Sequence, residues 1–596
     1  MRKPIFVAIV LSVILSNNAS AQKKPEAPVS QLCTRNSALD IIQQQTAGAK
    51  TFDNPVQRIA VMVRAADLMW PHEPAKARAA FTEAFDFATI DFKEKGDQTV
   101  RDGRMPMNLP DQRYLVIGAI AKRDPAWARK LTAQVIEESK SEAATDTAKD
   151  SSNPLQKAEK LFGVALSLIR TDVNSALVFG RMTFRQPASL YLPLFTYKLA
   201  ENNKALADTF YAEALAAYGN SPMDQFLYLS SYPFANDREA GEMPAWMGYK
   251  VPASVTPNPT LQRAFMQALL RQAQALSTRT TEARPGARYS EAAQIWMALS
   301  RLENKVQTFV PDLSPALQEA KGSMFVLMSQ KDQERTAANL IEPPKQTFAE
   351  KIEAAEKQTN PARRESGIAL AILGAPKDEP LDVVIAAADK LEDLGLRAQV
   401  LSRLYFNRSQ EALKNNQFDE ARRLASKVEQ LDQRAYLYSM IVSESIKAAK
   451  NDIEIREILE EVLAVTAKAP NTEVKARALL AVAYLFAKVD AIRGVGILGD
   501  AIKTINQIEN PDFSREQILT KIEGKEFGFY SALNTPGFNP ENAFREMGQF
   551  DFDGLLYQSG QFTNKSLRSM TTLALVEPCL LQTVPKKPTA KALPSN

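Results

Sequence analysis

The sequence predicts an all-α protein built from repeated pairs of helices, and three observations favour this fold class. Strong helix formers dominate the 596 residues, with Ala and Leu leading the apolar set and Glu, Lys, Arg and Gln the polar set. A short helix-start pattern recurs along the chain. Runs in which Val, Ile and Thr alternate strictly with polar residues are nearly absent, so no β-sheet is expected.

The recurring pattern is an Asp, Glu or Asn, usually followed by Pro or Val, with Ala four positions after the first residue. The acidic or amide side chain can cap the free N–H groups of a helix. Proline suits the first helical position because its missing N–H needs no partner there. Each copy therefore predicts a helix start, and the copies lie at residues 73–77, 124–128, 172–176, 203–207, 382–386 and 539–543.

Residues 1–21 are expected to be a secretory signal peptide. Two basic residues precede an apolar run at 5–15, and Ala19-Ser20-Ala21 forms a small-residue cleavage site. The mature chain is thus expected to be exported, periplasmic or extracellular, without stable membrane insertion. Its net charge falls from +4 to +2 when Arg2 and Lys3 are removed, which gives no electrostatic footprint for nucleic acid.

The mature chain divides by its patterning. A flexible segment at 22–36 precedes N-terminal helical repeats at 37–220, whose helix pairs include 56–69 with a helix starting at Pro74. An irregular segment, middle repeats, C-terminal repeats and a flexible tail are expected at 221–260, 261–342, 343–581 and 582–596.

The irregular segment at 221–260 is rich in Pro and aromatic residues. Long irregular segments inside compact proteins are often functional, so its aromatics are candidates for partner contact. The alternative is a loop that fills the superhelix with its own apolar groups. The candidate contact residues are Tyr232, Phe234, Trp246 and Tyr249.

The C-terminal repeats resemble the tetratricopeptide family. Asn416, Phe418 and Ala421 sit where that family places its turn residue, aromatic and small packing residue, and Leu480-Ala481-x-x-Tyr484 resembles its first-helix motif. The resemblance covers mainly residues 348–510. It implies an α-solenoid, a superhelix of helix pairs whose concave face binds proteins or peptides, and it implies no catalytic residue.

Cys33 and Cys579 are the chain's only cysteines, and they bracket almost the whole predicted fold. In an oxidising compartment they can form a disulfide, which would close the superhelix or fold it back on itself. The alternative is two separate buried thiols in an open array.

The sequence contains few candidate catalytic residues. A single histidine and two terminal cysteines exclude a Ser-His-Asp triad and a His/Cys zinc site, and no catalytic, cofactor or metal residue is predicted. Glu365-Ser366 is similar to the Glu-Ser pair of lytic transglycosylases, but the downstream Gly-x-Met-Gln element of that family is missing.

The sequence therefore predicts an exported helical-repeat protein that acts as a scaffold or peptide/protein-binding module in the cell envelope, with an unidentified protein or peptide as partner and no cofactor. Two alternatives stay open. One is a glycan-acting envelope enzyme that uses carboxylates only, and the other is a purely structural spacer. An enzyme is the less favoured class.

Overall fold

The computed structural model describes most of the chain between residues 30 and 581. The expected signal peptide and C-terminal tail lie outside the described residues, as do Trp246 and Tyr249. The described ranges are 30, 32–95, 99–102, 105–108, 111–143, 154–234, 251, 254–278, 289–340, 346–448, 452–513, 517–535 and 538–581.

These residues are almost entirely helical, which confirms the predicted all-α class. The helices of the first half are α1 (Arg35–Ala49), α2 (Pro55–Met69), α3 (Pro74–Lys95), α4 (Gln112–Ala121), α5 (Pro125–Ala143), α6 (Pro154–Leu168), α7 (Val173–Met182), α8 (Tyr191–Asn202), α9 (Lys204–Tyr218), α10 (Met223–Phe226), α11 (Pro259–Ser277), α12 (Glu291–Phe309), α13 (Ser314–Leu327) and α14 (Gln330–Leu340). Short 3₁₀ turns include η2 (Leu227–Leu229) and η3 (Tyr232–Phe234).

The second half begins after residue 345. Its helices are α15 (Phe348–Glu356), α16 (Pro361–Leu373), α17 (Leu381–Ala388), α18 (Leu394–Lys414), α19 (Phe418–Ala425), α20 (Leu431–Lys447), α21 (Asp452–Ala467), α22 (Glu473–Val489), α23 (Ala491–Asn506), α24 (Pro540–Met547), α25 (Phe552–Ser559) and α26 (Lys565–Leu580).

The helix-start pattern lies at a helix start in all six copies, and in five of them the helix begins at the second residue of the pattern. Asp172, Asn203 and Asn539 cap α7, α9 and α24 with their side chains, and α3 and α5 begin at the proline of the pattern. At 382–386 the predicted helix also begins, but one residue earlier: α17 starts at Leu381 after Pro380, which has no side chain able to cap, so Asp382 lies in the first turn and Ala386 is exposed.

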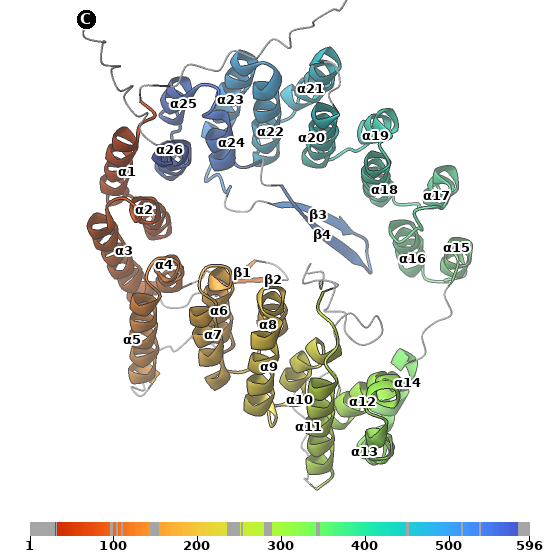
Figure 1. Cartoon of the computed structure of the whole chain (residues 1–596). Helices are drawn as coiled ribbons and strands as arrows, with labels where there is room; N and C mark the ends of the chain where they lie inside the picture. Colours follow the sequence, from red (N-terminus) through yellow and green to blue (C-terminus); the bar gives the residue numbers. More distant parts are fainter. Residues whose placement is uncertain are drawn as a thin grey trace, which may run out of the picture.

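The helices follow one another around a ring (Figure 1). An inner layer runs from α26 through α2, α4, α6 and α8, and again from α16 through α18, α20, α22 and α24, each helix packing on the next. Most other helices lie outside these and cover them. At the ends of the fold, α26 packs against both α1 and α2, so the last helix lies beside the first.

The expectation of no β-structure is wrong in two places. A hairpin of β1 (Thr99–Asp102) and β2 (Met105–Asn108) lies between α3 and α4, and a longer hairpin joins β3 (Gln517–Glu523) to β4 (Gly528–Asn534). Both are antiparallel and two-stranded; in the longer one, Ile518 pairs with Leu533 and Ile522 with Phe529.

The apolar core has two parts. One cluster of buried side chains spans Cys33 to Met328 and continues from Phe406 to Leu580, across the contact between the chain's ends. A smaller cluster contains the buried residues of α15–α17 and the first half of α18, together with Ile522 of β3.

In the described part of the chain, no helix combines the length and the apolar character that a bilayer-spanning segment needs.

Candidate functional site

The β3–β4 hairpin extends across the inner side of α16, α18 and α20 (Figure 1). Alternate residues of a strand point to opposite faces. On β3, Ile518, Thr520 and Ile522 are buried, while Leu519, Lys521 and Glu523 are exposed. The hairpin therefore packs one face on the inner helices and turns the other toward the middle of the ring.

Polar contacts attach the buried face to helices far away in the sequence. Gln433 of α20 donates a hydrogen bond from Nε2 to the Thr520 hydroxyl at 3.0 Å. At the tip of the hairpin, Glu526 pairs with Arg363 of α16, with 3.3 Å between Oε2 and Nε. These contacts fix the hairpin along its length rather than at its base alone.

Arg403 of α18 lies beneath β4. Its guanidinium carbon is 5.0 Å from the ring centre of Phe406 and 5.6 Å from that of Phe529, within the range of cation–π attraction. Its Nη2 donates to the Ser531 hydroxyl at 3.4 Å. Burial lowers the pKa of this guanidinium, yet arginine keeps its charge in proteins.

Beneath the hairpin, two polar side-chain atoms lack a hydrogen-bond partner within the described residues: Nε of Arg403 and Oε1 of Gln433. An unsatisfied buried polar atom costs about 1–3 kcal/mol of stability. Nearby on α20, burial raises the pKa of the Asp432 carboxyl, and the N–H of Gln433 only partly offsets this. The surface under the hairpin thus combines the apolar contacts of Ile518 and Ile522 with two unsatisfied polar atoms.

The outward face of the hairpin combines apolar, aromatic and charged groups. Leu519 and Tyr530 are 58% and 55% exposed. The Tyr530 hydroxyl donates to Glu523 at 2.7 Å, and Lys521 forms a 2.7 Å ion pair with the same carboxylate. Exposed aromatic and aliphatic side chains rimmed by charges are typical of protein contact surfaces.

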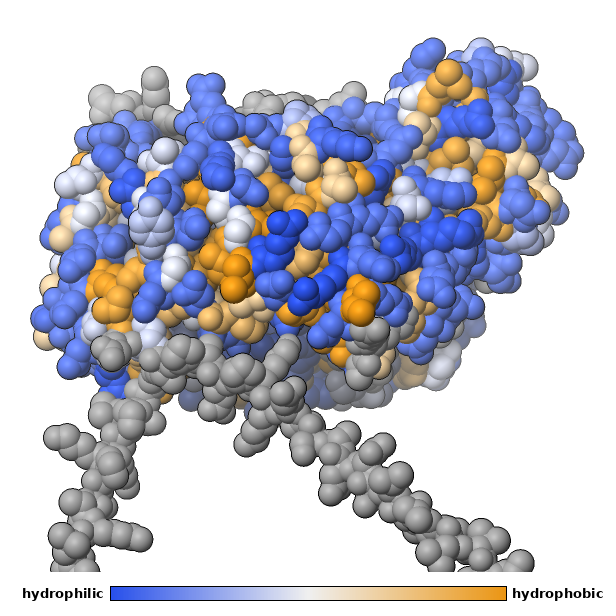
Figure 2. Space-filling model, turned by 90° about the horizontal axis from the view of Figure 1, so that it is seen from above, coloured by the Kyte–Doolittle hydropathy of each residue, from blue (hydrophilic) through white to orange (hydrophobic). Residues whose placement is uncertain are grey.

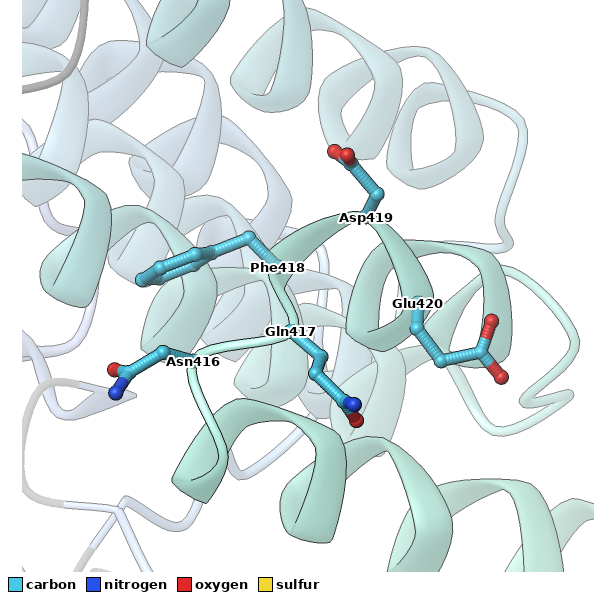
Figure 3. Close-up of a pocket in the computed structure, with 5 residues that line it drawn as sticks. All are labelled: Asn416, Gln417, Phe418, Asp419 and Glu420. Atoms are coloured by element: carbon cyan, nitrogen blue, oxygen red, sulfur yellow. The ribbon is translucent and has the colours of Figure 1, made fainter.

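A shallow depression of about 370 Å³ lies at the turn between α18 and α19, lined by Asn416, Gln417, Phe418, Asp419 and Glu420 (Figure 3). The turn is a Schellman motif. Asn416 has a left-handed backbone with φ 58°, and the N–H groups of Asn416 and Gln417 bond to the carbonyls of Leu413 and Ala412. The depression is a by-product of helix termination.

This turn carries the first motif of the tetratricopeptide resemblance. Asn416 supplies the left-handed residue, Phe418 begins α19, and Ala421 is fully buried and accepts a hydrogen bond from Ser409 at 2.8 Å. The Glu420 carboxylate pairs with Arg423, and this bond lowers the pKa of Glu420. These roles are structural.

Tyr232 and Phe234 are not exposed contact residues, which corrects that interpretation. They are 3% and 1% exposed. The ring centre of Tyr232 is 5.5 Å from that of Tyr197 and 5.4 Å from that of Tyr211, and Phe234 packs edge-on against Phe265. Trp246 and Tyr249, the other two candidates, lie outside the described residues.

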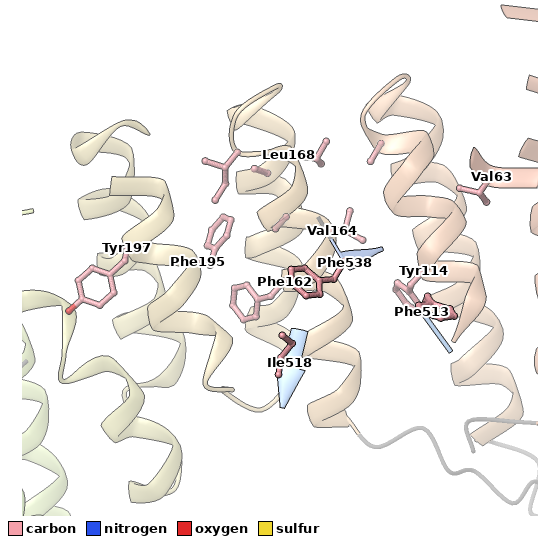
Figure 4. Close-up of a cluster of buried hydrophobic side chains, with 14 of the residues drawn as sticks. Val63, Tyr114, Phe162, Val164, Leu168, Phe195, Tyr197, Phe513, Ile518 and Phe538 are labelled. Carbon is pink, nitrogen blue, oxygen red and sulfur yellow. The ribbon is translucent and has the colours of Figure 1, made fainter. Parts of the chain in front are cut away.

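Buried aromatic side chains extend along the inner helices of the first half. Figure 4 shows Phe162 of α6 with Phe195 and Tyr197 of α8 among them, and all three are essentially unexposed. Tyr232 and Phe234 thus join the chain's own core. This corresponds to the alternative in which the irregular segment fills space with its own apolar groups.

Cys33 and Cys579 form a disulfide in the structure, with 5.1 Å between their Cα atoms. Hydrogen bonds and ion pairs surround it. Glu577 of α26 pairs with Arg64 of α2 at 2.6 Å and with Arg545 of α24 at 2.9 Å. We call this region, the disulfide together with the packing of α26 on α1 and α2, the terminal clasp.

Glu365 and Ser366 have structural partners. Oε1 of Glu365 accepts the backbone N–H groups of Glu392 and Asp393 at 2.9 and 2.8 Å, which ties α16 to the start of α18. The Ser366 hydroxyl donates to the Ala362 carbonyl. Both side chains thus make hydrogen bonds that stabilise the helices, and this geometry does not favour the glycan-acting alternative.

The face seen from above mixes hydrophilic and hydrophobic residues, and its hydrophobic groups are separated by hydrophilic ones (Figure 2).

Comparison with known proteins adds no assignment: no family model matches the chain, and no curated protein matches it. Because Leu519 and Tyr530 are exposed there, the candidate site is the outward face of the β3–β4 hairpin with the inner helices beside it.

Proposed function

We propose that this chain is an exported helical-repeat protein, a tetratricopeptide-like α-solenoid curved into a ring, that binds a segment of another protein on its inner side. The observation that carries this proposal is the exposed Leu519–Tyr530 face of the β3–β4 hairpin. The hairpin is the one element placed across the inner layer among the described residues of the second half, and it presents apolar and aromatic groups there.

The character of this face favours a polypeptide partner. Tyrosine offers a large contact area at low entropic cost and is enriched in binding hot spots, and Leu519 extends the exposed apolar area beside it. Lys521 and Glu523 beside them form an ion pair with each other, so the face has no net charge. A mixed apolar segment fits such a face better than a polyanion does.

Binding is tested by photo-crosslinking. A photoreactive amino acid placed at Leu519 should capture polypeptide from an envelope extract of the source cells, and mass spectrometry then identifies it. A synthetic peptide with the captured sequence is titrated against the purified protein. We expect Leu519→Ser/Tyr530→Ser to weaken this binding at least tenfold.

Ile492→Ser is the matched control. Ile492 is an aliphatic residue of α23 that is 88% exposed, so its replacement removes exposed apolar area away from the hairpin. Equal loss of binding in both variants would place the partner elsewhere. If no polypeptide is captured and none binds, the structural-spacer alternative gains and the binding proposal fails.

A further inference from the structure

The inner helix α6 turns one polar face toward the inside of the ring. Residues three and four apart share one face of a helix. On α6, Gln156 and Glu159 are partly buried while Gly163 and Ser167 are exposed, so these four residues lie on one accessible face. The other faces of α6 pack against α4, α7 and α8. Because α6 belongs to the inner layer (Figure 1), the accessible face lies on the inner side of the ring.

Two tyrosines border this face of α6. Tyr191 begins α8, which packs on α6, and Tyr228 lies in η2, which packs on α8. Both rings are partly buried against the larger apolar cluster. Burial raises the pKa of both phenols, and nearby carboxylates raise it further: Glu159 at Tyr191, and Asp224 together with Glu159 at Tyr228. Three elements of the fold thus place one carboxylate within electrostatic reach of two aromatic rings.

The charge of Glu159 is not offset by the chain's own cations. Burial raises the pKa of this carboxyl, and no cation among the described residues counters the effect. The ammonium of the adjacent Lys160 lies 5.7 Å from the ring centre of Tyr114 on α4, and Lys198 on α8 pairs with Glu201 at 3.0 Å. A carboxylate partly withdrawn from water without a counter-charge is unfavourable, so a cation placed beside Glu159 is stabilising.

An unsatisfied hydrogen-bond acceptor lies on the same face. Oε1 of Gln156, one helical turn before Glu159, is buried and has no hydrogen-bond partner within the described residues. The groups that need a partner are thus an amide oxygen and a carboxylate, and both are acceptors. A lysine ammonium and an arginine guanidinium carry donors and no acceptor, and tyrosine ring faces attract such cations.

A metal ion suits this place less well than an organic cation. Calcium takes six to eight oxygen ligands, whereas in the described part of the chain no three His, Cys, Asp or Glu side chains are grouped to hold a metal ion. The methylene stem of a lysine or arginine can instead pack on the tyrosine rings while its charged end meets the carboxylate.

We propose that Glu159, Tyr191 and Tyr228 form a cation site on the inner side of the ring, and that it receives a lysine or arginine side chain of the bound polypeptide. This inference deepens the proposed function and rests on it. The β3–β4 hairpin contacts apolar residues of the partner, and the cation site selects a basic residue. The partner is thus a segment that carries both kinds of residue.

The cation site is tested first without the natural partner. A fluorinated tyrosine is incorporated at Tyr228 of the whole protein, and its fluorine NMR signal is followed during titration at matched ionic strength. The probes are Nα-acetyl-lysine methylamide, Nα-acetyl-arginine methylamide and the uncharged Nα-acetyl-norleucine methylamide. We expect a saturable shift with the two cations and none with the norleucine compound.

Two variants show whether the carboxylate is responsible. Glu159→Gln should abolish the saturable shift. Glu213→Gln is the matched control, because Glu213 of α9 is already paired with Arg181 of α7 at 2.7 Å, and it should leave the shift unchanged. The cation site would be overturned by the lack of any saturable shift, by equal shifts with charged and uncharged probes, or by a shift that survives Glu159→Gln.

A second titration links the site to the bound polypeptide. The polypeptide captured at Leu519 is prepared with each of its lysines and arginines replaced by glutamine in turn. At least one replacement should weaken binding to the native protein about tenfold and have little effect on binding to Glu159→Gln, since contacting charges are not additive. Additive losses for every replacement would overturn the contact with the partner. If the native protein binds no polypeptide, the proposed function fails, while the fluorine titration still decides the cation site.

Discussion

The carboxylate of Asp208 accepts a hydrogen bond from the Tyr232 hydroxyl, with 2.8 Å between the oxygens. The same carboxylate accepts a 2.9 Å bond from Asn258, the N-cap of α11, and pairs with Lys204 at 2.8 Å. Tyr232 precedes the undescribed part of the irregular segment and Asn258 follows it. Asp208 therefore holds both ends of this segment at one point on α9.

Replacing Tyr232 by Phe removes only the hydroxyl of this contact. We expect Tyr232→Phe to lower the free energy of unfolding by about 1.5–3 kcal/mol, because the ring packing stays and one hydrogen bond to a charged group is lost. Denaturant unfolding measures the change. Tyr228→Phe, at a half-buried tyrosine of η2 nearby, is the control and should change stability by less than about 0.5 kcal/mol. Equal effects would argue against a special role for the Asp208 contact.

The terminal disulfide should be visible in solution. Intact mass of the exported protein should show alkylation of Cys33 and Cys579 only after reduction. Reduction should lower the free energy of unfolding by about 2–5 kcal/mol, because the bond closes a loop over 546 positions of the unfolded chain. Cys33→Ser/Cys579→Ser should match the reduced protein and be insensitive to reductant. Two thiols that react without reduction would contradict the closed ring.

Gly494 and Gly496 on α23 allow a matched comparison of two Gly→Ala substitutions. A Cβ on Gly494 would lie 2.7 Å from the backbone nitrogen of Ala487 and 2.9 Å from the carbonyl oxygen of Ala483, both on α22. We therefore expect Gly494→Ala to cost about 1–3 kcal/mol through overpacking. A Cβ on Gly496 meets nothing within 4 Å, so Gly496→Ala should raise stability by about 0.5–1 kcal/mol. Thermal unfolding distinguishes the two, and a harmless Gly494→Ala would refute the close approach of these helices.

Asp432 predicts a pH dependence. Burial raises the pKa of this carboxyl above its ordinary value of 3.8, so the folded state favours the protonated form. The stabilisation from protonation is complete below about pH 3.8 and is lost as the pH rises through the folded-state pKa. Asp432→Asn should therefore be more stable than the native protein at pH 7, with the difference shrinking toward acidic pH.

At Asp172 the expected pH dependence of stability has the opposite sign. Hydrogen bonds from the Ser175 hydroxyl and backbone lower the pKa of this N-cap carboxyl. Its contribution is present above pH 3.8 and is lost as the pH falls through the folded-state pKa. Asp172→Asn should be less stable than the native protein at pH 7, and this difference in stability should shrink toward acidic pH. Unfolding curves at several pH values test both variants, and parallel curves for all three proteins would contradict these shifts.

The helices could be predicted because their signals are local. The cap at Asn203 and its bond to the Leu206 N–H lie within four residues, so the start of α9 is written in one short stretch. At Asp382 the helix begins one residue earlier than the pattern indicates, because Pro380 and not Asp382 precedes the helix.

The contacts that define the candidate site are not local. Ile518, Thr520 and Ile522 do alternate with exposed residues, and Gly524 and Gly528 flank the turn, so a hairpin signal was present but short. What fixes it is packing on α18 and α20; Gln433 lies 87 positions from Thr520. The burial of Tyr232 depends in the same way on Asp208, because an aromatic residue in a Pro-rich segment carries no sign of the side it will face.

The terminal clasp has a consequence for proteolysis. Because Cys33 and Cys579 are bonded, the backbone between them and the disulfide form one covalent circle. A single peptide-bond cleavage anywhere from 33 to 579 opens that circle without producing two separate molecules. A nicked chain would still migrate as one species until it is reduced, and both of its halves would stay within reach of each other.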